Sequence, residues 1–221
     1  MAENTLTAEK VAQTVPSGAQ GLPAGRVSPA AHLAGAMAEL GERSQGTVAL
    51  REVQFAVQTG LRARPGTESA AALEGVLGLS LPAGHGQVTG DPEGQHVVWL
   101  SPDEFLAVDV SRQQAPGDTE ALERALDGLP GQAVDLSANR TILELTGTRA
   151  RQVLEKGFHL DLHPRAFTVG TAVASVLGPV PVILHRYAEN GFRVFPRASF
   201  ADYLVRWLLD AAEEFCHEEI P

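Results

Sequence analysis

Pairs of strand-like segments alternate with helix-like segments along this sequence, and that order restricts the folds open to it. Alternating and β-branched residues predict strands over four stretches, at 46–66, 96–110, 132–147 and 171–196. Apolar residues at helical spacing predict helices at 28–40, 67–79, 118–129, 148–157 and 199–215. Parallel neighbours need a helical crossover, whereas strands that follow each other directly pair antiparallel. We therefore expect an α+β fold with mixed or antiparallel sheets and helices packed on one face.

The most strongly amphipathic segment is SFADYLVRWLLDAAEEF, at 199–215. Its apolar side chains recur at i, i+3, i+4, i+7, i+8 and i+11, and they are Phe200, Tyr203, Leu204, Trp207, Leu208 and Ala211. Burial of such a face contributes about 1.5–3 kcal/mol per large side chain. We interpret this stripe as core, with an interface to another chain as the alternative.

The segment QAVDLSANRTILELTG predicts a β-hairpin. Val134 and Leu136 alternate with polar neighbours, residues 137–140 form the loop, and Leu143 and Leu145 alternate on the return strand. A short polar loop between two alternating runs is the usual signal for a local antiparallel pair. We therefore expect the two runs to be neighbours in one sheet.

Asn139 and Arg140, in this predicted loop, are candidate functional residues. An Asn–Arg pair can recognise a carboxylate or contact a partner chain. It can equally pin its own turn or form an internal ion pair. Both interpretations stay open at this point, and the loop is a candidate subunit interface.

The stretch GFHLDLHPRAF holds the second group of candidates. His159, Asp161 and His163 alternate, so in an extended strand they would share one face and supply three ligands to zinc or a catalytic pair. Pro164 indicates a connecting segment instead, in which short polar side chains cap backbone groups. We favour the structural or interfacial interpretation, in which Asp161, His163 and Arg165 hold the loop or contact a neighbour.

Composition and motifs exclude several classes of function. Seventeen Lys and Arg against 27 Asp and Glu give a net charge of −10 without a basic cluster, so neither nucleic acid nor a membrane is an expected partner. No apolar run approaches the roughly 20 residues that span a bilayer, and the first residues lack the apolar core of a secretory signal. No phosphate-binding loop, G-x-S-x-G or H-E-x-x-H motif is present. We accordingly assign no catalytic, cofactor-binding or metal-binding residue.

The single cysteine, Cys216, excludes a disulfide framework and fits a cytoplasmic location. It lies near the end of the sequence, where we expect neither a held base nor an oxyanion site, so it is not assigned as a nucleophile.

The sequence divides into a tail and an ordered part. Residues 1–27 contain no aromatic side chain and are rich in Gly, Ala, Ser and Thr, which predicts a flexible N-terminal arm. Ser28 is a favourable N-cap and predicts the first helix. We expect residues 28–221 to form a single α+β domain. The alternative is two subdomains, at about 28–130 and 131–215.

Five segments, taken in order, resemble the gamma-subunit family of heterotetrameric sarcosine oxidases. They are SPAAHL, LREVQF, WLSPDEFLAV, VDLSANRTILELTGTRARQVLEKGFHLDLHPRAF and SFADYLVRWLLDA. The resemblance runs from about Ser28 to Ala212, and the block at 135–167 is its most specific part. It implies a fold similar to the first part of the glycine-cleavage aminomethyltransferase.

The resemblance also implies a role inside a four-subunit enzyme that demethylates sarcosine oxidatively to glycine. Such an enzyme makes hydrogen peroxide, with formaldehyde or, in the presence of tetrahydrofolate, methylenetetrahydrofolate. FAD, FMN, NAD and tetrahydrofolate are then expected on the alpha and beta subunits and zinc on the delta subunit. The gamma subunit carries no assigned catalytic residue in this family, so this chain is expected to be a structural partner of the alpha, beta and delta subunits.

A free-standing, folate-binding relative of the aminomethyltransferase is the alternative function. It requires a pterin-binding carboxylate in a central cleft, for which the candidates are Asp135, Glu144 and Glu104. The sequence is too short to include the closing C-terminal barrel of the complete aminomethyltransferase, which argues against a complete folate site on this chain.

Overall fold

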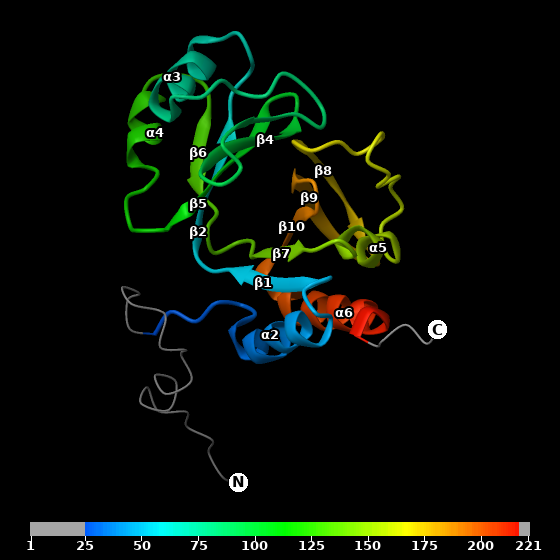
Figure 1. Cartoon of the computed structure of the whole chain (residues 1–221). Coiled ribbons are helices and arrows are strands. Elements are labelled where there is room, and N and C mark those ends of the chain that lie inside the picture. The colour runs from blue at the N-terminus through cyan, green and yellow to red at the C-terminus, as the bar shows by residue number, and fades with distance from the viewer. Residues whose placement is uncertain (1–24, 217–221) are drawn as a thin grey trace.

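The computed structural model describes residues 25–216, which form two five-stranded sheets with helices outside them (Figure 1). Sheet A has the strand order β1-β7-β10-β9-β8, with bounds Ala49–Val53, Ile142–Thr146, Gly191–Pro196, Val180–Ala188 and Thr171–Leu177. Sheet B has the order β3-β4-β5-β2-β6, with bounds Val88–Gly90, Gln95–Ser101, Glu104–Gln113, Ala56–Arg62 and Gln132–Asp135. All strand pairs within the two sheets are antiparallel.

Helices cover one face of each sheet, which confirms the predicted α+β class. Sheet A packs against α2 (Ala34–Arg43), α5 (Ala150–Glu155) and α6 (Ala201–Ala212). Sheet B packs against α3 (Glu68–Leu77) and α4 (Glu120–Ala125), as Figure 1 shows at the opposite end of the molecule. Three short 3₁₀ turns are η1 (Ala31–Leu33), η2 (Ala198–Phe200) and η3 (Glu213–Cys216). None of the helices within residues 25–216 is long and apolar enough to cross a membrane.

Three apolar clusters make up the core. One lies between sheet A and its helices, and a second lies between sheet B and its helices. The third lies between the two sheets. The alternation along β7 shows how one strand serves two of them: Leu143 and Leu145 belong to the helix-side cluster, and Ile142 belongs to the cluster between the sheets. Each sheet is therefore buried on both faces over its central strands.

The predicted stripe on α6 is confirmed in part. Leu204, Leu208 and Ala211 are buried, but Phe200 and Tyr203 are 39% and 46% exposed. The buried face instead includes Val205 and the small residues at both helix ends, so it lies about one residue further along the helix than the hydrophobic pattern indicates. The pattern counted two aromatic side chains as core that lie at the surface.

The predicted hairpin at 132–147 is wrong. β6 pairs with β2, with Gly60 opposite Val134, whereas β7 pairs with β1 and β10 in the other sheet. Residues 136–141 connect the sheets rather than forming a hairpin loop. The alternation was read correctly as two strands, but periodicity carries no information on which strand is the partner.

Part of the prediction of a flexible arm at 1–27 lies outside the described residues, since the description begins at Gly25. The domain organisation, either one domain or two subdomains that meet near residue 130, stays a prediction. The sheets exchange strands across that position, because β6 belongs to the sheet of the earlier strands and β1 to the sheet of the later ones.

Candidate functional site

The chain passes between the sheets twice within the described residues, and both passages lie together. We call these two segments, 54–55 and 136–141, the crossover. Phe55 has a left-handed backbone (φ 56°), which turns the chain from β1 into β2. The backbone N–H of Leu136 donates to the Gln58 carbonyl at 2.8 Å, which joins the second passage to the start of β2.

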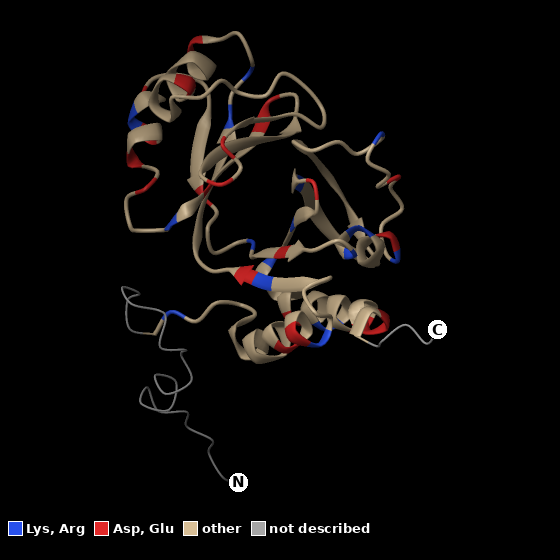
Figure 2. Cartoon of the chain, viewed as in Figure 1, with Lys and Arg blue, Asp and Glu red and all other residues tan. Residues whose placement is uncertain are grey.

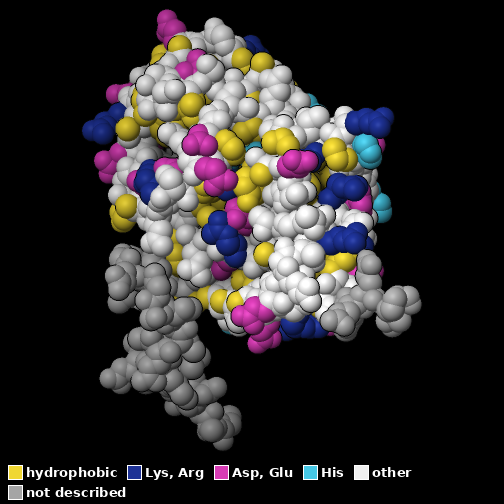
Figure 3. All heavy atoms as spheres, in the orientation of Figure 1, with side chains coloured by type: hydrophobic (Ala, Val, Ile, Leu, Met, Phe, Trp, Pro, Cys, Tyr) yellow, Lys and Arg dark blue, Asp and Glu magenta, His cyan; other side chains and the backbone are white. Residues whose placement is uncertain are grey.

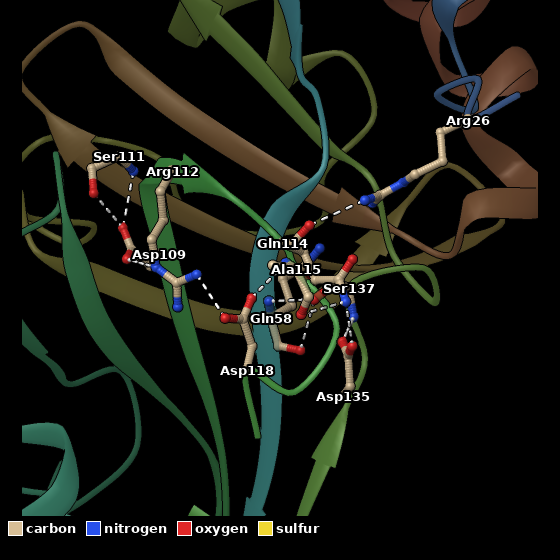
Figure 4. Close-up of polar contacts among 10 residues, drawn as sticks. All are labelled: Arg26, Gln58, Asp109, Ser111, Arg112, Gln114, Ala115, Asp118, Asp135 and Ser137. Carbon is tan, nitrogen blue, oxygen red and sulfur yellow. Dashed lines mark hydrogen bonds and ion pairs between the residues drawn. The ribbon is translucent and has the colours of Figure 1, made fainter. Parts of the chain in front are cut away.

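Side chains bind the two passages of the crossover to each other (Figure 4). The Gln58 backbone N–H donates to Ser137 Oγ at 2.9 Å. Gln58 Nε2 donates to the Arg140 carbonyl at 2.8 Å. The Ser137 N–H in turn donates to Asp135 Oδ1 at 2.9 Å. Gln58 is 2% exposed and its two bonds are partly buried, whereas the bond between Ser137 and Asp135 lies at the surface.

The candidate pair Asn139 and Arg140 lies at the end of the crossover, beside Arg197. Arg140 Nη1 donates to the Phe195 carbonyl at 3.1 Å, and Arg197 Nη1 donates to Asn139 Oδ1 at 3.2 Å. Burial lowers the pKa of Arg140, and the neighbouring positive charge of Arg197 lowers it further. Neither arginine forms an ion pair within the described part of the chain, and the Asn139 N–H donates to the Leu136 carbonyl at 2.8 Å within the turn.

The start of the described chain lies against the same place. Arg26 Nη1 donates to the Gln114 carbonyl at 3.1 Å (Figure 4). Its guanidinium also lies over the Phe55 ring, with Cζ 4.4 Å from the centroid. A cavity of about 320 Å³ opens here, and its lining includes Arg26, Val27, Phe55 and Arg140.

A buried carboxylate, that of Glu52, binds the segment at residues 28–30, which follows this cavity in the chain. Glu52 is 9% exposed and accepts hydrogen bonds from Ser28 Oγ and Thr141 Oγ1, each at 2.5 Å, and from the Ala30 N–H at 3.2 Å. The prediction that Ser28 caps the first helix is therefore wrong, because its hydroxyl is bonded to Glu52 and α2 begins at Ala34.

The second candidate group forms a self-supporting loop rather than a shared site. Asp161 Oδ1 accepts from the His163 N–H at 2.9 Å, and His163 Nδ1 accepts from the Arg165 N–H at 3.2 Å. His159 and these three residues are exposed, while Leu162 and Phe167 are buried. Residues 25–216 contain no group of three or more His, Cys, Asp or Glu that could hold a metal ion, which argues against the zinc interpretation.

A row of polar side chains crosses the inner face of sheet A, and sequence reasoning missed it. Register places Arg51, Glu144, Arg193 and His185 opposite one another on four neighbouring strands. Arg193 is 1% exposed; its Nε donates to Glu144 Oε2 at 2.9 Å, and its Cζ lies 3.9 Å from the centroid of the Tyr187 ring. Burial raises the pKa of Tyr187 to about 12.

This polar row continues into sheet B through a pair of histidines. The rings of His185 and His96 lie 5.3 Å apart, and neither residue is exposed. His96 Nδ1 lies 3.2 Å from the Gly94 carbonyl, whereas His96 Nε2 and both ring nitrogens of His185 have no partner among the described residues. Burial lowers the pKa of His96 to about 4 and that of His185 to about 3. In the sequence, the histidines within the otherwise apolar runs HVVWL and VILHRY were the features that could have indicated this pair.

Cys216 is half-buried in η3, and burial raises the pKa of its thiol. A raised pKa keeps the sulfur protonated at neutral pH, which disfavours the nucleophilic form. The structure thus adds no support for a role of Cys216 in catalysis.

The three candidate pterin-binding carboxylates do not converge on one cleft. Glu144 is paired inside sheet A, Asp135 accepts from Gln114 Nε2 at 2.9 Å, and Glu104 pairs with Arg62 at 3.3 Å. Each of the three carboxylates therefore has a partner within the chain.

Comparison with known proteins agrees with the resemblance seen in the sequence. The model of the family described as "Sarcosine oxidase, gamma subunit family" matches residues 62–214. The sarcosine oxidase subunit gamma of Corynebacterium sp. (strain U-96) is 47% identical over 195 residues, which are 88% of this chain and 94% of the relative. That of an Arthrobacter species is 49% identical over 190 residues, covering 86% and 91%.

Solved structures give the same result. A chain of the heterotetrameric sarcosine oxidase from Corynebacterium sp. U-96, in complex with pyrrole 2-carboxylate, superposes with a TM-score of 0.82 at 47% identity, covering 89% of this chain and 99% of that one. The glycine cleavage system aminomethyltransferase T from Bartonella henselae has a TM-score of 0.55 at 18% identity, covering 77% and 48%, and shows a shared fold alone. The chain belongs to the sarcosine oxidase gamma subunit family.

Proposed function

We propose that this chain is a structural subunit of a heterotetrameric sarcosine oxidase and that the chemistry takes place on its partners. The observation that carries the proposal is the match to 99% of one chain of such an enzyme at a TM-score of 0.82. The match spans nearly the whole of that chain rather than a short motif, which supports the same subunit role for this chain.

The proposed assembly oxidises sarcosine with O₂ and water to glycine, formaldehyde and hydrogen peroxide, or passes the one-carbon unit to tetrahydrofolate as methylenetetrahydrofolate. The alpha and beta subunits would hold FAD, FMN, NAD and tetrahydrofolate, and the delta subunit would hold zinc. A cytoplasmic location stays a prediction.

The internal bonding of the polar residues supports a structural role. Within the row across sheet A, Glu144 is paired with the buried Arg193 and with the exposed Arg51. Asp135 and Glu104 have partners at the surface. Figure 2 shows acidic and basic residues interspersed over both sheets, and the face drawn in Figure 3 shows apolar side chains mixed with both charges. The exposed loop residues Asp161, His163 and Arg165 remain proposed contacts to a neighbouring subunit.

Co-expression of this chain with the alpha, beta and delta subunits of the same organism tests the proposal. We expect the tagged gamma chain to co-purify with all three, and its omission to abolish a stable, active oxidase measured by peroxide production. The gamma chain purified alone is expected to show no flavin absorbance near 450 nm. Stoichiometric flavin on the isolated chain, or full oxidase assembly without it, would contradict the proposal.

The folate-binding alternative predicts saturable binding of tetrahydrofolate to the purified chain. The paired state of Glu144, Asp135 and Glu104 argues against it. Calorimetric titration with tetrahydrofolate is the direct test, with an Asp135→Asn variant, at an exposed position, as the comparison. A saturable heat signal that the variant loses would favour the alternative.

A further inference from the structure

Three arginines around the crossover have no carboxylate partner within the described residues: Arg26, Arg140 and Arg197. Each donates to a neutral oxygen instead. The acceptors are the Gln114 carbonyl at 3.1 Å, the Phe195 carbonyl at 3.1 Å and the Asn139 side chain at 3.2 Å. A guanidinium has five N–H donors, so each retains donors for a further acceptor.

This arrangement differs from that of seven of the 15 arginines in the sequence. Ion pairs with Asp or Glu are formed by Arg43, Arg51, Arg62, Arg112, Arg151, Arg193 and Arg206. The crossover brings together these three guanidinium groups. The two carboxylates bonded to it, Glu52 and Asp135, accept from neutral donors rather than from an arginine among the described residues.

Two of the three charges are forced close together. Arg140 and Arg197 are opposite each other in an isolated antiparallel bridge, so their backbones fix the two side chains side by side. The repulsion between them and the partial burial of Arg140 make an anion favourable at this point. A carboxylate suits it best, because planar guanidinium groups bind carboxylates with two parallel hydrogen bonds.

Apolar side chains at the surface adjoin these arginines. Val27 follows Arg26 and is 51% exposed, and Phe200, whose N–H donates to the Arg197 carbonyl, is 39% exposed. Arginine and aromatic residues are enriched at protein interfaces. A small carboxylate would leave both apolar side chains in water, whereas a protein segment would cover them.

We propose that the crossover surface, formed by Arg26, Val27, Asn139, Arg140, Arg197 and Phe200, docks a segment of a partner subunit that presents an Asp or Glu side chain beside an apolar one. The cavity of about 320 Å³ next to Arg26 and Arg140 has room for that acidic side chain. This inference rests on the proposed function and specifies which face of the chain meets its partner and by what chemistry.

Charge reversal in the co-expressed complex tests the inference. Arg197→Glu is the main variant, because Arg197 is exposed and its side chain makes one exposed bond, to Asn139, so we expect the fold to stay intact. Arg140→Gln is the second variant. Arg124→Glu, on the exposed face of α4, is the matched control for the change in net charge. The tagged gamma chain is immobilised, and release of the other subunits is measured across a series of NaCl concentrations.

We expect Arg197→Glu to accelerate release at least tenfold and Arg140→Gln several-fold, with Arg124→Glu within twofold of wild type. If the wild-type chain binds its partners and both crossover variants release them at the wild-type rate, the inference is overturned and the proposed function still stands. Absence of association in the wild type would refute the proposed function itself. Release of partners from wild type by 10 mM acetate or sarcosine, but not by equal NaCl, would show that a free carboxylate occupies the surface and would overturn the assignment to a protein side chain.

Discussion

Acid destabilises this fold through the histidine pair between the sheets. His96 and His185 have no exposed surface, and their rings lie 5.3 Å apart close to the positive charge of Arg193. A proton on either ring would place a charge in the buried layer between the sheets, beside Arg193, where no carboxylate of the described residues bonds to either ring. Both rings are therefore neutral in the folded protein, and protonation favours the unfolded chain.

The size of the effect follows from the two pKa values. The unfolded chain takes up these protons near pH 6.5, whereas the folded chain takes them up near pH 4 at His96 and near pH 3 at His185. Stability from the neutral rings is fully present above about pH 6.5 and is lost as the pH falls toward 4 and then 3. At about pH 4.5 each histidine lowers the free energy of unfolding by roughly 2–3 kcal/mol relative to neutral pH. This is a large part of a typical free energy of unfolding, which is about 5–15 kcal/mol.

Urea unfolding followed by tryptophan fluorescence between about pH 7.5 and 4.5 measures this loss. His185→Leu removes two buried ring nitrogens without partners, so we expect unchanged or higher stability at neutral pH and a markedly shallower loss in acid. The control is His159→Gln at an exposed position, which should follow the wild-type curve. Parallel curves for wild type and His185→Leu would refute the reasoning.

Two further substitutions test the packing of the same fold. Glu144→Gln removes the buried charged partner of Arg193 and leaves only the exposed Glu93 among the described residues, at 3.8 Å. We expect a loss of about 3 kcal/mol in denaturant unfolding at neutral pH; an unchanged midpoint would contradict this. Gly147→Ala is strained at φ 113° and would place a Cβ 2.3 Å from the Thr47 carbonyl oxygen, so we expect a fall in Tm of several degrees. Gly75→Ala, in an open position of α3, should instead leave Tm unchanged or raise it slightly, and equal effects of the two alanines would contradict the packing argument.

Local patterns predicted individual elements well and their partners poorly. The helix predicted at 67–79 and the buried side of α6 at Leu204 and Leu208 are present as predicted. The hairpin at 132–147 is absent, because β6 and β7 each pair with strands far away in the sequence. Strand pairing is a contact between residues at large separation, and alternation within one segment does not encode it.

The sequence alone determined the α+β class, the positions of most helices and strands, and, through the specific block at 135–167, the gamma-subunit family. These depend on local periodicity and on the identity of neighbouring residues. The tertiary structure alone decided that Arg140 lies beside Arg197 and that His96 meets His185, since each pair joins segments more than 50 residues apart. The first pair forms through a backbone bridge beside the pairing of β7 with β10, and the second forms where the two sheets pack together. Both arrangements are properties of the whole chain.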